Sequence, residues 1–281
     1  MATPRSSSFM LSSATIMMAP AFTTSVFELQ PSLHSLGMSR DVAVKVDSSL
    51  IELKNGIAQT TVDARRTGVS ASISATLYEM TAANMQRALA LASATAPVVK
   101  RGVLSSAAAA AAVSISVNSD PVPGDSNTAI TAVGDIPSGS TILIQRINGE
   151  QDYVFPTTST GVATGTGPYS IPIASTSAIP SGMSFAAGSH VWILSPISIA
   201  SSTADDLFGV KITGTLSNYD RPVTVLFPKV RISKGFQLQY TETDYGSMPL
   251  EMTPFIMSSS EATGRLAEIG TTAPGILYVG A

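Results

Sequence analysis

Side chains that could carry out acid–base or metal chemistry are few and scattered in this sequence. His34 and His190 have no second histidine or paired carboxylate at metal-ligand spacing, so we expect both to be structural. Glu242 and Asp244 stand two residues apart, with no second group that would make one an acid and the other a base. The chain contains no cysteine, which excludes a thiol nucleophile and disulfides. We therefore expect no catalytic site, no cofactor and no metal.

Two glycine-containing stretches match catalytic or nucleotide-binding motifs only in part. Gly124-Asp125-Ser126-Asn127-Thr128 lacks the second glycine of G-x-S-x-G and consists of turn-forming residues. Gly165-Thr166-Gly167 has the start of a dinucleotide fingerprint, but Pro168 and Pro172 interrupt the helix whose N-terminus would bind phosphate. Both stretches are predicted to be turns.

The composition favours contact with protein over contact with nucleic acid. Charged residues make up 12% of the 281 residues, about half the typical fraction, and the net charge is −3. Arg65-Arg66 and Lys100-Arg101 are the small basic pairs, and neither would neutralise several phosphates at once. A surface with so little charge suits burial against other protein chains.

The first 40 residues show no sustained period and contain three prolines, so we predict an extended N-terminal arm over residues 1–40. The stretch Phe9–Ala21 (FMLSSATIMMAPA) ends in a formal A-x-A site. Arg5 is the only positive charge before it, and polar residues interrupt its apolar run, so we expect no cleaved signal. The chain has no run of about 18 apolar residues, so we expect no transmembrane helix and no membrane partner.

Alternating residues predict strands and a hairpin in the next segment. Residues 42–46 place three valines on one face of a strand. A second run, LIELK at 50–54, leads to Asn55-Gly56, a pair typical of type I′ turns, so we predict a hairpin over residues 50–63. From Val69 to Leu77, apolar residues alternate with serine and threonine, which predicts a strand with one buried face and one hydroxyl-rich face.

The strand is followed at once by a helix pattern. Thr81 is a plausible N-cap, and Met85, Ala88, Leu89 and Ala92 follow at one-face helical spacing. Because a helix of about ten residues is marginal alone in water, it must pack on the sheet. We predict that Met85, Ala88 and Leu89 make this contact.

Shorter strands and turns follow the helix. The six-alanine run Ala107–Ala112 is predicted to be a linker or the start of a strand. Residues 113–205 alternate short strand runs with Pro/Gly turns, which predicts a small all-β module. Longer strands resume at Asp206, and Pro228 inside one of them indicates an edge strand or a bulge. The Gly/Thr/Ala-rich residues 258–281 are predicted to form a C-terminal arm.

Two blocks of the chain resemble a known family. The succession RRTGVSASISATLYEMTAANMQRALAL, residues 65–91, is similar to a recurrent element of bacteriophage and prophage tail tube proteins. The later run Pro222–Val230 (PVTVLFPKV), followed by Asp244-Tyr245-Gly246, looks like the late strand pair and loop of the same family. Together the blocks cover roughly residues 40–95 and 206–257, so the resemblance leaves much of the chain unmatched.

The resemblance implies a mainly β fold. It predicts a β-sandwich or barrel tube domain with one short flanking α-helix, formed discontinuously by residues 41–112 and 206–257. The module at 113–205 would be an insertion. Six copies would form a ring, and rings would stack into a tail tube, the conduit for DNA delivery. An open sheet edge invites pairing with another chain, and closure into a ring removes that edge.

The expected partners and contact sites follow from this interpretation. The partners are further copies of the chain, a tail sheath protein in a contractile tail, a tape measure protein and transiting DNA without sequence-specific binding. The location would be the virion tail, assembled in the host cytoplasm. We expect the loop from Asp47 to Arg66 to contact the adjacent ring, with these candidate residues: Leu50, Glu52, Lys54, Asn55, Gly56, Gln59, Arg65 and Arg66.

Other functions also fit the sequence. A baseplate hub or tube initiator would use a related fold. A secreted or cell-surface β-rich adhesin or fibre subunit would explain the Ser/Thr-rich surface, and a hydrolase on a β scaffold is opposed by the missing site. No enzyme activity is expected.

Overall fold

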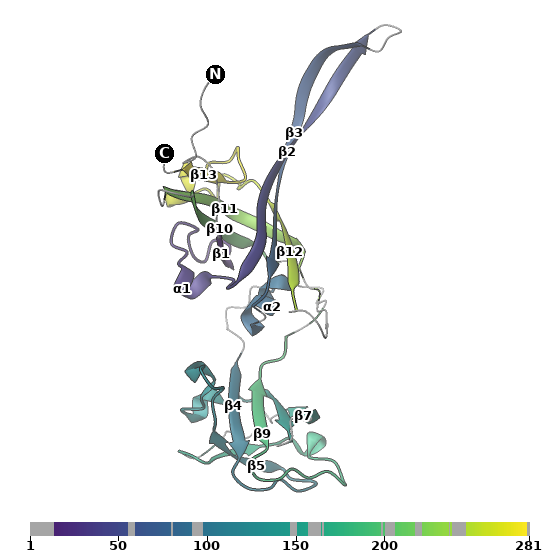
Figure 1. The fold of residues 1–281 in the computed structure, drawn as a ribbon, viewed down its shortest axis with the longest axis vertical. Coiled ribbons are helices and arrows are strands. Elements are labelled where there is room, and N and C mark those ends of the chain that lie inside the picture. Colours follow the sequence, from purple (N-terminus) through teal and green to yellow (C-terminus); the bar gives the residue numbers. More distant parts are fainter. Residues whose placement is uncertain are drawn as a thin grey trace. The chain divides into compact units, whose positions relative to one another are not determined.

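The computed structural model contains two compact units (Figure 1). Unit 1 comprises Met1–Ala94 and Ile199–Ala281, and unit 2 comprises Thr95–Ser198. The structure describes residues 14–55, 60–79, 81–91, 98–146, 151–156, 164, 166–197, 199, 206–216, 221–235, 237 and 246–279. The prediction of a mainly β chain is confirmed, because both units are built on antiparallel sheets that curl into half-barrels.

Unit 1 is a single antiparallel sheet of seven strands. The strands are β1 (Thr15–Pro20), β2 (Ser39–Asn55), β3 (Thr60–Leu77), β10 (Phe208–Leu216), β11 (Arg221–Lys234), β12 (Met248–Pro254) and β13 (Ile276–Val279). Their order is β1-β10-β11-β12-β3-β2, and β13 pairs with β11 on the side opposite β10. Strands β12 and β13 occupy different stretches of the same β11 edge, at 230–234 and 223–226 respectively. The β2 strand therefore forms one edge of the sheet.

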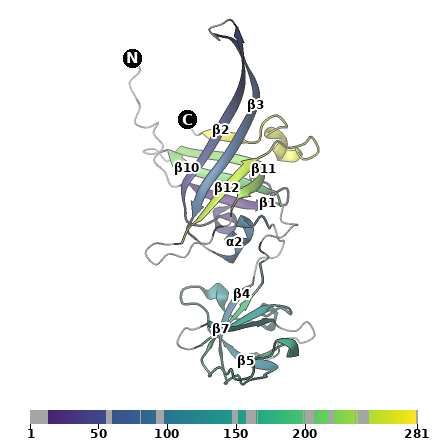
Figure 2. The same ribbon diagram turned by 90° about the vertical axis from the view of Figure 1, so that its right-hand side faces the viewer.

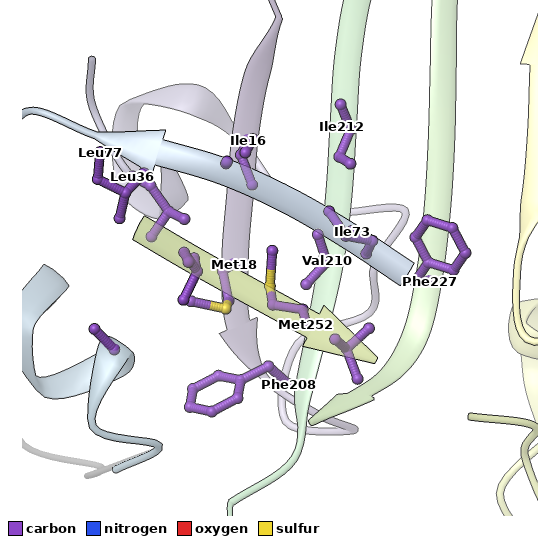
Figure 3. Close-up of a cluster of buried hydrophobic side chains, with 14 of the residues drawn as sticks. Ile16, Met18, Leu36, Ile73, Leu77, Phe208, Val210, Ile212, Phe227 and Met252 are labelled. Carbon is purple, nitrogen blue, oxygen red and sulfur yellow. The ribbon is translucent and has the colours of Figure 1, made fainter. Parts of the chain in front are cut away.

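The main core of unit 1 lies inside the curl of this sheet. Figure 3 shows side chains of β3 and β12 meeting those of β1, β10 and β11. On β3 the buried side chains alternate with serine and threonine, so the expected two-faced strand is present from residue 71 to 77. The large members of the cluster are Ile16, Met18, Leu36, Ile73, Leu77, Phe208, Ile212, Phe227, Met248, Leu250 and Met252.

The described residues of both predicted arms are folded into unit 1, so those predictions are wrong there. Strand β1 pairs with β10, and Ile16 and Met18 are fully buried in the core. The short helix α1 (Pro31–His34) follows it. At the other end, β13 pairs with β11, and the 3-10 helix η5 (Gly264–Glu268) precedes Ile269, which packs in a second small core. Residues 1–13 lie outside the described part of the chain.

Strand β11 is central, so Pro228 does not mark an edge. Phe208 pairs with Val230 and Val210 pairs with Phe227, which leaves Pro228 and Lys229 opposite the single residue Gly209. This two-against-one arrangement is a β-bulge, the second of the two predicted possibilities. Proline is tolerated there because a bulge leaves one residue outside the regular ladder of hydrogen bonds.

The predicted helix is present as α2 (Ala82–Ala88). Thr81 caps it, since its hydroxyl oxygen accepts a hydrogen bond from the backbone N–H of Asn84 at 3.1 Å. Ala88 is buried in the main core, whereas Met85 and Leu89 are only half-buried. An added Cβ at Gly235 would overlap the carbonyl oxygen of Ala88, so a glycine there permits the helix end to approach β11.

Asn84, which the sequence analysis did not select, is the polar anchor of α2. Its side chain is 3% exposed, and Nδ2 donates to the carbonyl oxygens of Leu36 at 2.9 Å and Glu79 at 3.0 Å. These bonds tie the helix to the segments that precede β2 and follow β3. A buried amide with its partners in place is costly to remove, because its acceptors are then left without donors.

Replacing Asn84 by leucine is therefore expected to destabilise unit 1 by about 1–3 kcal/mol, although leucine keeps the same branched arrangement of side-chain heavy atoms. Denaturant unfolding monitored by circular dichroism would measure the loss. Gln86→Leu, a half-buried position on the same helix, is the matched control and should have a much smaller effect. Equal midpoints for Asn84→Leu and the parent would contradict the anchoring role.

Unit 2 is a second antiparallel sheet. Its strands are β4 (Val99–Leu104), β5 (Ser114–Ser119), β6 (Thr141–Gln145), β7 (Gln151–Pro156), β8 (Tyr169–Pro172) and β9 (His190–Leu194), in the order β7-β6-β9-β4-β5-β8. Val99 at the start of β4 pairs with Leu194 at the end of β9. Short 3-10 helices lie between strands: η2 (Ser126–Thr128), η3 (Val133–Asp135) and η4 (Ser175–Ser177).

The compact unit begins earlier than the predicted module at 113–205, because β4 pairs with both β5 and β9. The six-alanine run belongs to it and is not helical: Ala108 forms an antiparallel bridge with Phe185, and both are buried in the core of unit 2. Tertiary pairing has overridden the helix propensity of alanine here.

Asp135 fastens the loop around η3 in unit 2. Burial alone would raise the pKa of Asp135, but its Oδ2 accepts hydrogen bonds from the Thr131 amide (2.6 Å), the Thr131 hydroxyl (2.8 Å) and the Ala132 amide (3.0 Å). Lys100 adds an opposite charge, with Nζ 3.4 Å from Oδ1. The bonds and the charge outweigh burial and hold the pKa at about 2.

Because the pKa of Asp135 is lower in the folded chain than its ordinary value of 3.8, its carboxylate stabilises unit 2 above pH 4 and ceases to do so as the pH falls toward 2. Asp135→Asn should therefore cost roughly 1–2 kcal/mol at pH 7, and the parent and variant should converge in acid. Trp192, the single tryptophan, lies in unit 2 and reports its unfolding by fluorescence. The exposed Asp47→Asn serves as control, and a pH-independent difference for Asp135→Asn would refute this role.

Candidate assembly surface

The residues considered above for acid–base or metal chemistry make local contacts within the fold. His34 Nδ1 accepts the Gln30 amide at 3.1 Å beside α1, and Asp125 accepts the Asn127 amide at 3.0 Å in the η2 turn. His190 lies beside Arg101, 2.9 Å from its guanidinium, in unit 2. Within the described ranges, no group of three or more His, Cys, Asp or Glu could hold a metal ion. Glu242, Asp244 and Gly165 lie outside the described residues.

The β2–β3 hairpin is the feature that stands apart in unit 1. The two strands, of 17 and 18 residues, extend past the other strands of their sheet (Figure 2). Strand β12 pairs with β3 only between Ile73 and Leu77. In the part of the chain that the structure describes, the stretch of β2 and β3 beyond Ile73 has no third strand. We call this stretch, residues 44–55 and 60–72, the ribbon.

The ribbon exposes large apolar side chains on both of its faces. Val44, Val46 and Leu50 occupy even positions along β2. Their side chains lie on the face that continues the core side of Ile73. Ile51 and Leu53 point to the opposite face. Leu50, Ile51 and Leu53 are 58%, 64% and 63% exposed. A two-stranded ribbon is marginally stable in water, and exposed apolar residues on both faces are typical of a binding surface.

The open edges of the ribbon are equally accessible to another chain. Each residue of β2 has β3 on one side, and no described strand pairs with its other side. The outer edge of β3 is open from Thr60 to Ser72 for the same reason. Long edges with unpaired backbone groups are templates for further strand pairing.

Charged side chains on the ribbon are paired along their own strands. Lys45 and Asp47 are 2.9 Å apart, Lys54 and Glu52 3.6 Å, and Arg65 and Asp63 3.4 Å. The two members of each pair are two positions apart in the sequence, so they lie on the same face of their strand. These exposed pairs contribute little to stability, which leaves their charges available to a partner.

The predicted contact residues partly coincide with this surface. Leu50, Glu52, Lys54, Arg65 and Arg66 are exposed on the ribbon, and Asn55 is the last residue of β2. Gly56 and Gln59 lie outside the described residues. Asn55 pairs with Thr60 and so belongs to β2, whereas the second residue of the predicted turn, Gly56, lies outside the described residues.

Four exposed apolar residues of the ribbon were not among the predicted contact residues. Val46, Ile51, Leu53 and Val69 were not selected, because an alternating pattern predicts that an apolar face is covered. The predicted separate strand at 50–54 is instead continuous with residues 42–46. The adjacent apolar pair Leu50-Ile51, which puts bulky residues on both faces, was the available signal.

A groove of about 980 Å³ opens where the ribbon leaves the sheet. One wall is β3, and the other consists of the ends of β11 and β12 and the loop before β13. Its lining includes the half-exposed Val69, Phe255 and Ile256, with Arg66, Lys229 and Arg231 as its cations. Among the described residues that line it, none is acidic.

The Lys229 charge in this groove is neutralised within unit 1. Its Nζ lies 2.8 and 2.9 Å from the two carboxylate oxygens of Glu261, which also accepts the Ser258 amide at 2.7 Å. The hydrogen bond from Lys229, followed by that from Ser258, lowers the pKa of Glu261 to about 2. Arg66 and Arg231 also line the groove.

A scan against protein-family models finds no match to this chain, and a search of curated proteins finds none either. Among the described residues, no helix has the length and apolar character needed to cross a membrane.

Replacing Leu50, Ile51 and Leu53 together by serine is expected to leave the thermal stability of the monomer nearly unchanged, because exposed substitutions usually alter it by about 0.5 kcal/mol or less. The same variant should lose self-association in sedimentation velocity experiments. Leu33, Val113 and Ile199 are similarly exposed but lie off the ribbon, so their serine triple variant is the matched control. Normal association of the ribbon variant would argue against this surface.

Proposed function

We propose that this chain is a structural subunit that assembles with copies of itself. The observation that carries the proposal is the ribbon, whose apolar side chains are exposed on both faces and whose two edges are open. A monomer in water would gain nothing from such an element. A copy of the chain supplies apolar surface and strand edges of the same kind, so self-association buries both.

The two edges of the ribbon differ, and this supports a ring over a simple dimer. One edge belongs to β2 and the other to β3, so the β3 edge of one copy can pair with the β2 edge of the next. Such contacts are heterologous, and heterologous contacts close into rings or extend as filaments. Pairing β2 with β2 would consume one edge and leave both β3 edges open.

The specific assembly we propose is the tail tube of a bacteriophage or prophage, built from stacked closed rings of about six copies, the number that the sequence resemblance implies. Its support is the sequence resemblance of residues 65–91 and 222–230, together with a mainly β fold in which α2 directly follows the long strand β3. The expected partners are then a tape measure protein, transiting DNA and, in a contractile tail, a sheath protein. The low surface charge fits a subunit buried among its copies.

Negative-stain electron microscopy of the purified chain tests this function. Hollow rings or tubes of uniform width are expected at high protein concentration, with the serine triple variant of the ribbon as the negative control. Sedimentation equilibrium over the same concentration range would show whether the parent stays monomeric, and a persistent monomer would overturn the proposal. Solid fibres without a lumen would retain self-assembly but reject the tube.

A further inference from the structure

The two edge strands of the unit 1 sheet, β1 and β2, approach each other at one end. Met17 of β1 forms an antiparallel bridge with Ser35, which shortly precedes β2. At the start of β2, the Ser39 hydroxyl donates a hydrogen bond to the carbonyl oxygen of Ala14 at 3.5 Å. The curl of the sheet thus brings its two edges into contact here.

Both neighbours of β1 continue past its first residue. Strand β10 pairs with β1 as far as Thr213, opposite Thr15, and then extends to Leu216. Strand β2 extends to Asn55, and no described strand pairs with its outer edge. A strand that prolonged β1 backwards from Thr15 would therefore meet an open edge on each side, and open edges are templates for strand pairing.

A largely apolar cleft of about 650 Å³ lies beside these open edges. One wall is the start of β2 as far as Val44, and the other consists of the paired ends of β10 and β11 with Leu277 of β13. Ile212 belongs to the main core, and Val42 and Val225 pack against it, so the cleft opens directly onto the core. Leu277 and Val44 remain 57% and 38% exposed on its two sides. Within the described residues, this side of the core has no cover.

Connectivity selects the occupant of the cleft. Ala14 lines the cleft and packs against the main core, so the chain that precedes it starts at the cleft and needs no linker to reach it. Such an attached segment has a high effective concentration at the site, whereas a segment of another molecule must first associate. The preceding residues also contain the apolar run Phe9–Leu11.

We propose that residues 9–13, which lie outside the described part of the chain, prolong β1 within this cleft and close the half-barrel of unit 1 against β2. Because the contact between β1 and the start of β2 is antiparallel, each step before Ala14 advances one position along β2. At about 3.3 Å per residue, the segment would reach Val44. Alternation from Ala14 and Ile16, which face the main core, would put Met10 on the core side as well.

This contact lies within one chain and goes beyond the proposed self-assembly. It would cover the apolar side chains of Leu277 and Val44 and would give backbone partners to β2 from Arg40 to Val44. The rest of β2, from Val46 to Asn55, would stay open. Strand β2 would therefore have two uses: its start completes the fold of its own unit, and its remainder is left for other copies.

Disulfide trapping tests the contact in the full chain, which has no cysteine of its own. The double variant Met10→Cys/Val44→Cys is oxidised at a concentration at which the parent is monomeric. A disulfide requires Cα atoms within about 7 Å, so a bond within one chain reports close contact. The control is Met10→Cys/Phe255→Cys, because Phe255 is 39% exposed, as Val44 is at 38%, but lies beside the groove. We expect the first pair to close at least about tenfold faster, measured by mass spectrometry of unreduced digests.

Equal rates for the two cysteine pairs would overturn the inference. So would a faster cross-link between separate Met10→Cys and Val44→Cys chains than within the double variant, since the occupant would then come from a second copy. Neither result bears on whether the parent self-associates, which sedimentation measures separately.

Hydrogen exchange gives a second readout that needs no cysteine. In the triple variant Phe9→Ser/Met10→Ser/Leu11→Ser, the backbone amides of residues 40–44 should exchange at least about tenfold faster than in the monomeric parent, because their partner strand would be lost. Peptides from unit 2 serve as the internal control and should not change. Unaltered exchange over residues 40–44 would contradict the closure of the half-barrel.

Discussion

The point at which β12 stops pairing with β3 determines the properties of the rest of unit 1. From Leu77 to Ile73, β3 has neighbours on both sides and its apolar side chains are buried. Beyond Ile73, the same alternation continues through Val69, but only β2 remains beside the strand. The apolar face of the ribbon is thus the core face of the sheet, prolonged past the end of the core.

The same end of pairing produces the groove. As β3 and β12 separate, the side chains between them lose the neighbours that a continuous sheet would provide, and an apolar gap with basic walls remains. An exposed apolar ribbon and an exposed apolar groove therefore have one structural cause. Extending the pairing of β12 along β3 would remove both features together, so they are not independent surfaces of the molecule.

The local sequence pattern predicted the strands and the helix of this fold better than it predicted which strands pair with one another. The alternation over residues 69–77, the Thr81 cap and the turn-rich middle segment each depend on residues close in sequence, and the structure contains the corresponding strand, helix and β unit. The predicted arms failed because the partners of β1 and β13 lie about 200 and 50 residues away along the chain, beyond the reach of periodicity. Exposure of the ribbon could not be predicted for the same reason, since it depends on where β12 ends. Asn84 was missed because one polar residue in a short helix has no pattern around it.

Within each unit, the chain segments that lead to the other unit lie close together. In unit 1, the Asp206 amide donates to the carbonyl oxygen of Ala90 at 3.3 Å, and in unit 2, Val99 pairs with Leu194. To unit 1, unit 2 is therefore an insertion whose ends already meet, which costs little chain entropy to close. Because its ends meet, unit 2 can be replaced, enlarged or reduced to a short turn in the course of evolution. The ribbon, the groove and the curled sheet of unit 1 would keep their residues and their contacts.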